Sequence, residues 1–186
     1  MEIKVELSNR HVHLTNEAVA VLFGEGYELT VKKNLEPPAF AANETVSIVG
    51  RKGKLDGVRV LGPNRKKLQV ELLRSDCVRL GIEAPVCMSG DVNSMGPCRI
   101  VGPNGELDVE HGVMIAQRHI HMTEETAEKF GLKNKQIVKI RGGRRKTTFE
   151  ECFVKVYKGT LDVIHLDFDE GNAAALANGD MMEIIP

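Results

Sequence analysis

A six-residue motif that occurs twice constrains the fold of this chain more than any other feature of its sequence. Arg-His-Val-His-Leu-Thr occupies residues 10–15, and Arg-His-Ile-His-Met-Thr occupies residues 118–123. A weaker echo joins Gly-Pro-Asn at 62–64 to the same tripeptide at 102–104. Such a repeat predicts two related structural units, each of which presents the same corner between a strand and a helix.

Short segments rich in valine and isoleucine, separated by glycine and proline, predict a fold that is mostly β. The expected strands are 3–7, 45–49, 57–61, 68–72, 99–101, 137–141, 149–157, 161–168 and 181–185. Thr15 and Thr123 are typical helix N-caps, so we expect short helices at 16–23 and 124–130. A third helix is expected to begin near Glu170 and to cover 172–177. The predicted class is a β-barrel or β-sandwich with small helices.

Composition excludes several classes of protein. With 186 residues, 42% of them hydrophobic, the chain has room for one domain or two very small ones. A net charge of −1 gives no overall field that would attract nucleic acid or an anionic membrane. No apolar stretch reaches the roughly 18–20 residues that span a bilayer, and the N-terminal sequence has no signal-peptide pattern. The four cysteines lack C-x-x-C spacing, which indicates reduced thiols. We expect a soluble intracellular protein.

The two histidine pairs are candidate metal ligands. On a strand, residues i and i+2 point to the same face, so His11 and His13 can bind one ion, as can His119 and His121. Imidazole is the usual nitrogen ligand of zinc and of related metals. A metal site needs a further ligand, and His165 is a good candidate. On its expected strand, His165 shares a face with Asp167, opposite the apolar face of Ile164 and Leu166.

The segment 62–72 carries two more candidate groups. Arg65 and Glu71 share one parity along the expected strand, while Leu68, Val70 and Leu72 share the other. A carboxylate and a guanidinium on one face suit a metal ligand and an anion clamp. The parity by itself, however, favours a solvated charged face.

Five stretches together resemble the PduL-type phosphotransacylases, which are phosphate propanoyltransferases. They run in order along nearly the whole chain, and the two histidine motifs among them are specific. The similar stretches are 8–14, 62–65 with 69–71, 84–86 with 89–91, 116–122, and 165–172.

The resemblance implies a fold of two small tandem β-barrels with short capping α-helices. One barrel would combine residues 1–10 with 117–186, the other would comprise 11–116, and the active site is expected between them. The implied reaction converts a short-chain acyl-CoA, such as propanoyl-CoA or acetyl-CoA, and phosphate into an acyl phosphate and CoA. Because no Ser-His or Cys-His arrangement indicates a covalent acyl-enzyme, we expect direct transfer.

The resemblance also assigns the site residues. One zinc ion would be bound by His11, His13 and Glu71, and a second by His119, His121 and His165. Arg65 matches the phosphate-binding arginine of the family. Because of this match, we favour functional roles for Arg65 and Glu71 over the interpretation that they form a solvated charged face.

Location and partners follow from the same resemblance. The chain begins a few residues before its first motif, without the N-terminal extension by which family members enter bacterial microcompartments. We therefore expect a cytoplasmic bacterial enzyme that binds acyl-CoA and phosphate. A homo-oligomer is possible, and no nucleic-acid or membrane partner is expected.

Two alternatives remain open from the sequence. The spacing of His11, His13, Glu17 and Gly24 also fits the first metal motif of cupins, which are single-metal enzymes. In the second copy, Leu132 stands where that glycine should be. The other alternative is a non-catalytic module that binds metal or CoA without turnover. The number of metal ions bound per chain would distinguish a cupin from a two-zinc enzyme. Catalytic turnover of acyl-CoA would distinguish an enzyme from the non-catalytic module.

Overall fold

The computed structural model describes residues 1–91 and 95–186, which form two compact units. Unit 1 comprises Met1–Asn9 and Gln117–Pro186, and unit 2 comprises Arg10–Ala116. Each unit has its own hydrophobic core. Within the described ranges, no helix is long and apolar enough to span a bilayer.

Unit 2 is built around a closed ring of strands. Its elements in chain order are β2 (His11–His13), α1 (Asn16–Phe23), β3 (Val31–Asn34), β4 (Phe40–Gly50), β5 (Gly53–Gly62), β6 (Gln69–Glu71), α2 (Arg74–Leu80), β7 (Val86–Cys87), β8 (Gly96–Val101) and β9 (Glu106–Ala116). Hydrogen-bonded pairing runs from β2 through β5, β4, β8, β9 and β6 back to β2. β3 and β7 pair with β4 and β9 outside this ring.

Unit 1 is a second closed barrel. Its elements are β1 (Glu2–Ser8), β10 (His119–Thr123), α3 (Glu124–Phe130), β11 (Ile137–Gly142), β12 (Thr147–Tyr157), β13 (Val163–Asp167), α4 (Phe168–Ala174) and β14 (Met181–Ile185). Pairing runs from β10 through β12, β11, β14, β1 and β13 back to β10. The mostly β class and the two small barrels with short helices are therefore confirmed.

The two rings have the same strand directions. Starting from the strand of the histidine pair, successive pairs are parallel, antiparallel, antiparallel, antiparallel, parallel and antiparallel in both units. Strand β10 is thus equivalent to β2, β13 to β6, and β1 to β9.

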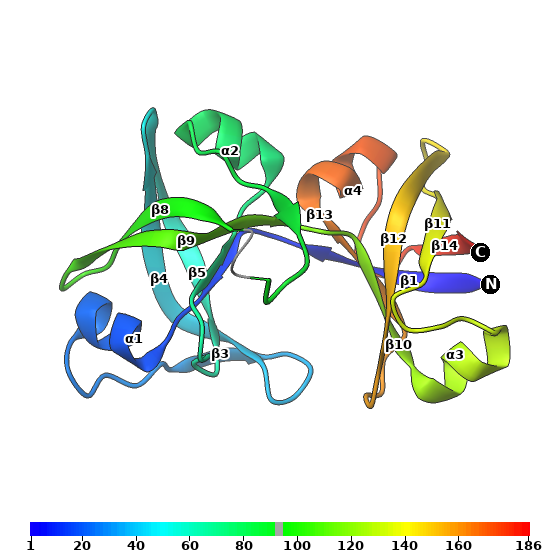
Figure 1. Cartoon of the computed structure of the whole chain (residues 1–186), viewed down its shortest axis with the longest axis horizontal. Coiled ribbons are helices and arrows are strands. Elements are labelled where there is room, and N and C mark those ends of the chain that lie inside the picture. The colour runs from blue at the N-terminus through cyan, green and yellow to red at the C-terminus, as the bar shows by residue number, and fades with distance from the viewer. Residues whose placement is uncertain (92–94) are drawn as a thin grey trace. The chain divides into compact units, whose positions relative to one another are not determined.

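This equivalence reveals an exchange between the two halves of the chain. β1 precedes β2 in sequence, as β9 precedes β10, yet β1 completes the barrel of unit 1 and β9 completes that of unit 2. Figure 1 shows the blue β1 among yellow-to-red strands of unit 1. The repeat seen in the sequence is therefore a repeat of topology in which the first strands have changed places.

The expected caps form at the first and third helices. The Thr15 hydroxyl accepts a hydrogen bond from the Ala18 amide at 3.1 Å, and the Thr123 hydroxyl accepts one from the Thr126 amide at 3.2 Å. Each hydroxyl satisfies an amide that has no partner inside its helix. The two predicted helices have the predicted bounds.

The helices differ from the expectation in two respects. Helix α2 was not expected, because its N-cap is Leu73, which carries no polar capping group. Helix α4 begins at Phe168 and ends at Ala174, whereas the sequence placed it near 170–177. The Asp167 carboxylate accepts a hydrogen bond from the Glu170 amide at 2.8 Å, so this residue ends the strand and starts the helix.

Strand β11 offers a direct test of the core of unit 1. Ile140 is fully buried, whereas Ile137 on the same strand is 55% exposed. We expect Ile140→Ala to lower the free energy of unfolding by about 2–5 kcal/mol, because it leaves a cavity. Ile137→Ala is the control and should change it by less than about 0.5 kcal/mol. Urea denaturation of both variants measures the difference, and equal losses would contradict the assigned core.

Candidate metal centres

The histidine pairs lie on two equivalent short strands. On β2, Val12 between the two histidines is fully buried in the core of unit 2. On β10, Ile120 occupies the same place in the core of unit 1. Since side chains alternate along a strand, both histidines of each pair share the face opposite these core residues.

The first candidate centre, here called the His11 group, consists of His11, His13 and Glu71. One potential ligand atom from each lies within 4.8 Å of the others. The His11 and His13 rings meet edge to face with centroids 5.0 Å apart, and His11 Nε2 is 3.5 Å from Glu71 Oε2. His13 is buried, whereas the other two are partly buried.

The second candidate centre, the His119 group, consists of His119, His121 and His165. Their potential ligand atoms also lie within 4.8 Å of one another. The three ring centroids are 4.9–5.0 Å apart. His119 Nδ1 lies 2.9 Å from the Gln117 carbonyl oxygen, which can only accept a hydrogen bond. The neutral ring therefore carries its proton on Nδ1 and leaves the Nε2 lone pair for a metal.

Strand register explains why the third members come from distant segments. β6 runs antiparallel to β2 and places Glu71 opposite His11. β13 runs antiparallel to β10 and places His165 opposite His119. Glu71 and His165 therefore occupy equivalent positions in the two barrels. The structure brings together all six residues that the sequence singled out as ligands, three in each unit.

The donor sets fit zinc. Three imidazoles, or two imidazoles and a carboxylate, are the ligand sets of zinc sites that keep one position open for substrate. Burial, together with the nearby His11 and Arg65, lowers the pKa of His13 to about 3, while Glu71 and a hydrogen bond to the Leu61 carbonyl act in the opposite direction. His13 is thus neutral at neutral pH. Its buried Nδ1 has no hydrogen-bond partner among the described residues, as expected of an atom reserved for a metal.

Arg65 lies beside the His11 group. It follows β5 in the connection to β6, and its backbone amide donates a 2.8 Å hydrogen bond to the Leu14 carbonyl, just beyond β2. The Arg65 side chain is exposed, but the protein atoms around it partly desolvate the guanidinium and lower its pKa, while the nearby Glu71 carboxylate opposes that change. An arginine next to a candidate metal centre can hold an oxyanion in a bidentate manner.

Two ion pairs near these strands were missed by sequence reasoning. The Arg10 Nε lies 2.6 Å from Asp76 Oδ2, and the Arg118 Nε lies 2.6 Å from Glu170 Oε1. Each arginine directly precedes a histidine pair. Each acid is the third residue of a helix: Asp76 in α2, which follows β6, and Glu170 in α4, which follows β13. The arginine in both copies of the repeat was the signal that could have revealed them.

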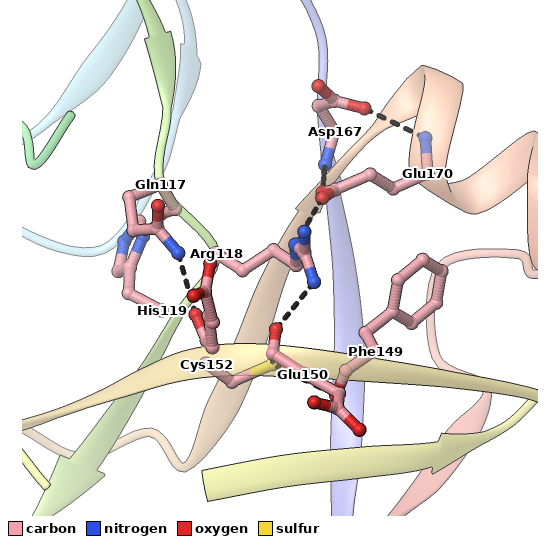
Figure 2. Close-up of polar contacts among 9 residues, drawn as sticks. Gln117, Arg118, His119, Phe149, Glu150, Cys152, Asp167 and Glu170 are labelled. Carbon is pink, nitrogen blue, oxygen red and sulfur yellow. Dashed lines mark hydrogen bonds and ion pairs between the residues drawn. The ribbon is translucent and has the colours of Figure 1, made fainter. Parts of the chain in front are cut away.

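The second ion pair has further anchors (Figure 2). Arg118 Nη1 donates to the Glu150 carbonyl at 2.5 Å, and its guanidinium lies 5.5 Å from the centre of the Phe149 ring. The neighbouring Gln117 side chain donates to the Glu151 carbonyl at 2.6 Å. Glu170 in turn accepts a 3.0 Å hydrogen bond from the Asp167 amide. These contacts fasten the start of β10 to both β12 and α4.

Glu170 predicts a pH dependence of stability. Its pKa is raised from 4.5 to about 7, chiefly by burial and also by the Asp167 charge, while the hydrogen bond from the Asp167 amide and the Arg118 charge oppose the rise. Between pH 4.5 and 7 the folded chain therefore binds more protons here than the unfolded chain, so the free energy of unfolding should fall as pH rises. Glu170→Gln should flatten this decline, and the exposed Glu128→Gln should not. Urea denaturation across this range measures the slopes, and equal slopes in both variants would refute the assignment.

The cupin alternative does not agree with the geometry. It requires Glu17 as a ligand, but Glu17 lies in the first turn of α1 and is exposed. The carboxylate that joins His11 and His13 is Glu71.

Comparison with known proteins gives a consistent result. A model of the family described as phosphate propanoyltransferase matches residues 4–177. A phosphate propanoyltransferase of Thermotoga maritima is 50% identical over 98% of this chain and 89% of its own length. Enzymes of the same name from Lachnoclostridium phytofermentans and Clostridioides difficile are 42% and 43% identical, over 98% of this chain and 87–88% of their lengths.

Proposed function

Because this chain belongs to the phosphate propanoyltransferase family and is therefore an acyltransferase, we propose that it converts a short-chain acyl-CoA and phosphate into an acyl phosphate and CoA, using two zinc ions. The His11 group would hold one ion and the His119 group the other. When bound, zinc supplies Lewis acidity toward the thioester carbonyl and a soft partner for the departing thiolate.

Arg65 is the proposed phosphate ligand. Its guanidinium has the planar fork that pairs with two phosphate oxygens, and it lies close enough to His13 to lower the pKa of that imidazole. A phosphate held in this way presents a third oxygen to the thioester carbon. In the reaction a C–O bond forms, the C–S bond breaks, and CoA leaves as a thiolate that takes up a proton from the medium.

Direct transfer is favoured over a covalent acyl-enzyme. A cysteine nucleophile needs a lowered pKa, because the thiolate is the reactive form. Burial raises the pKa of the Cys98 thiol to about 12 and that of the Cys152 thiol to about 11. Burial also raises the pKa of Cys87, and Cys77 is 1% exposed. None of these four thiols is suited to accept the acyl group.

The observation that supports this proposal most is the donor set. Two groups at equivalent positions of two barrels offer three ligands each, in a chain of this family. The test is release of free CoA from acetyl-CoA and propanoyl-CoA, with and without phosphate. Protein stripped of metal by a chelator and then reloaded with zinc is compared with stripped protein.

The result expected is release that needs both phosphate and zinc, and the ratio of the two rates gives the acyl preference. Release without phosphate would identify a thioesterase instead. Binding of metal or CoA with no release from any short acyl-CoA would identify a non-catalytic module and overturn the proposal.

A further inference from the structure

Gln69 is a buried polar side chain next to the His11 group. It lies on β6 two residues before Glu71, so both side chains emerge on the same face of that strand. The register of β2 and β6 places it opposite His13. Gln69 is only 2% exposed. A buried amide is costly unless its donors and acceptor are used, so its partners define what it does.

Each polar atom of the amide has a partner. Nε2 donates to Glu71 Oε1 at 2.6 Å and to the Ser89 hydroxyl at 2.9 Å. Oε1 accepts from the Gly90 backbone amide at 2.9 Å. The Gly90 N–H can only donate and an ionised carboxylate can only accept, so these neighbours fix the orientation of the amide.

The two oxygens of Glu71 are thereby distinguished. Oε1 faces the Gln69 amide, whereas Oε2 faces His11 Nε2 at 3.5 Å. A carboxylate is able to bind a metal through one oxygen or through both. A hydrogen bond that occupies Oε1 leaves Oε2 for the ion and selects the one-oxygen mode.

The equivalent position in unit 1 supports this interpretation. There the third group member is His165, and Val163 lies opposite His121 as Gln69 lies opposite His13. The valine side chain has no group that can form a hydrogen bond. An imidazole can bind a given metal ion through only one of its two ring nitrogens, so it has no choice between a one-atom and a two-atom mode. Glutamine therefore stands beside the ligand that is a carboxylate, and valine beside the ligand that is an imidazole.

We infer that Gln69 is a positioning residue, which holds Glu71 so that one carboxylate oxygen binds the metal of the His11 group. This inference rests on the proposed function, because it takes Glu71 as a metal ligand. Partners of this kind typically change metal affinity by about 10- to 100-fold when they are removed.

The test uses Co²⁺ titrations of the full chain carrying His119→Ala and His121→Ala, so that the visible absorption reports on the His11 group. This parent is compared with Gln69→Val, Glu71→His, and Glu71→His combined with Gln69→Val. The last variant gives unit 2 the residues that unit 1 has at these positions. Thermal unfolding of each metal-free variant is followed in parallel.

Gln69→Val is expected to weaken Co²⁺ binding by about 10- to 100-fold when Glu71 is present, and by less than about threefold when histidine replaces it. The Co²⁺-saturated spectrum of Gln69→Val should also be weaker than that of the parent, because a carboxylate released to bind through both oxygens raises the coordination number. If the variants that carry Glu71→His bind no Co²⁺, the affinities cannot be compared between backgrounds. The Co²⁺-saturated spectrum of Gln69→Val with Glu71 present then tests the inference by itself.

Three results would overturn the inference: unchanged affinity in Gln69→Val, equal losses in both backgrounds, or an unaltered saturated spectrum. A parent that binds no Co²⁺ would instead refute the metal site, and with it the proposed function.

Discussion

Replacing His119 with alanine is expected to abolish phosphate-dependent CoA release and to lower the zinc content from two ions to one per chain. The reason is that the His119 group offers three ligands, and the contact of His119 Nδ1 with the Gln117 carbonyl oxygen orients this ring with Nε2 as its metal-binding atom. Loss of an outer partner of a ligand costs about 10- to 100-fold, so loss of the ligand itself should cost more than about 100-fold. Rates of CoA release and zinc content by atomic absorption are measured on the same sample.

Two variants make this expectation sharper. His11→Ala removes the equivalent residue of the other barrel and should give the same loss of activity and of one zinc ion. His111→Ala is the matched control, since His111 is exposed and lies outside both groups. If one of the two ligand variants kept full activity with one zinc ion, a single metal would suffice and the two-zinc proposal would be wrong.

Replacing Arg65 with alanine is expected to raise the KM for phosphate and to lower kcat/KM by about 100-fold or more, with zinc content unchanged. Each hydrogen bond to a charged group is worth about 1.5–3 kcal/mol, the guanidinium fork would make two of them to phosphate, and each 1.4 kcal/mol is tenfold. Arg65→Lys keeps the charge but loses the bidentate fork, so it should recover only part of the activity.

Lys66→Ala is the control for Arg65, because it removes an exposed positive charge from the adjacent residue. Initial rates at varied phosphate and fixed propanoyl-CoA separate KM from kcat. Equal effects of the Arg65 and Lys66 substitutions would mean that the segment contributes only a general positive field. Loss of zinc in Arg65→Ala would assign the arginine to metal binding instead of phosphate binding.

The sequence predicted most of the fold because its strands and turns are encoded locally. Alternating apolar residues and Gly-Pro turns marked the majority of the strands, and two threonines marked two helices. Helix α2 was not predicted, because its N-cap is Leu73, which has no polar side chain. The Asp76 carboxylate accepts a 3.2 Å hydrogen bond from the Leu73 amide instead. The exchange of β1 and β9 depends on pairing between distant segments, which local patterns do not record.

Some residues of the candidate site could be predicted from the sequence, and others could not. The histidine pairs were visible from spacing alone, because i and i+2 on a strand share a face. Glu71 and His165 were less certain, since what makes them group members is an antiparallel register with β2 and β10. The roles of Arg10 and Gln69 were missed for a similar reason, because Asp76 and Gly90, which they contact, are remote in sequence. The cytoplasmic location and the possible homo-oligomer stay predictions.

The exchange of first strands has a consequence for the order in which the nascent chain can fold. Every strand of the unit 2 ring lies between residues 11 and 116, so this barrel can close while the second half is still being translated. β1 is synthesised before any of them, but its partners β13 and β14 follow only after residue 162. Until then β1 has two unpaired edges, the feature that makes strands prone to aggregation. The strand made first thus completes the barrel that closes last, and its alternation of charged residues with the buried Ile3 and Val5 keeps one face polar during that wait.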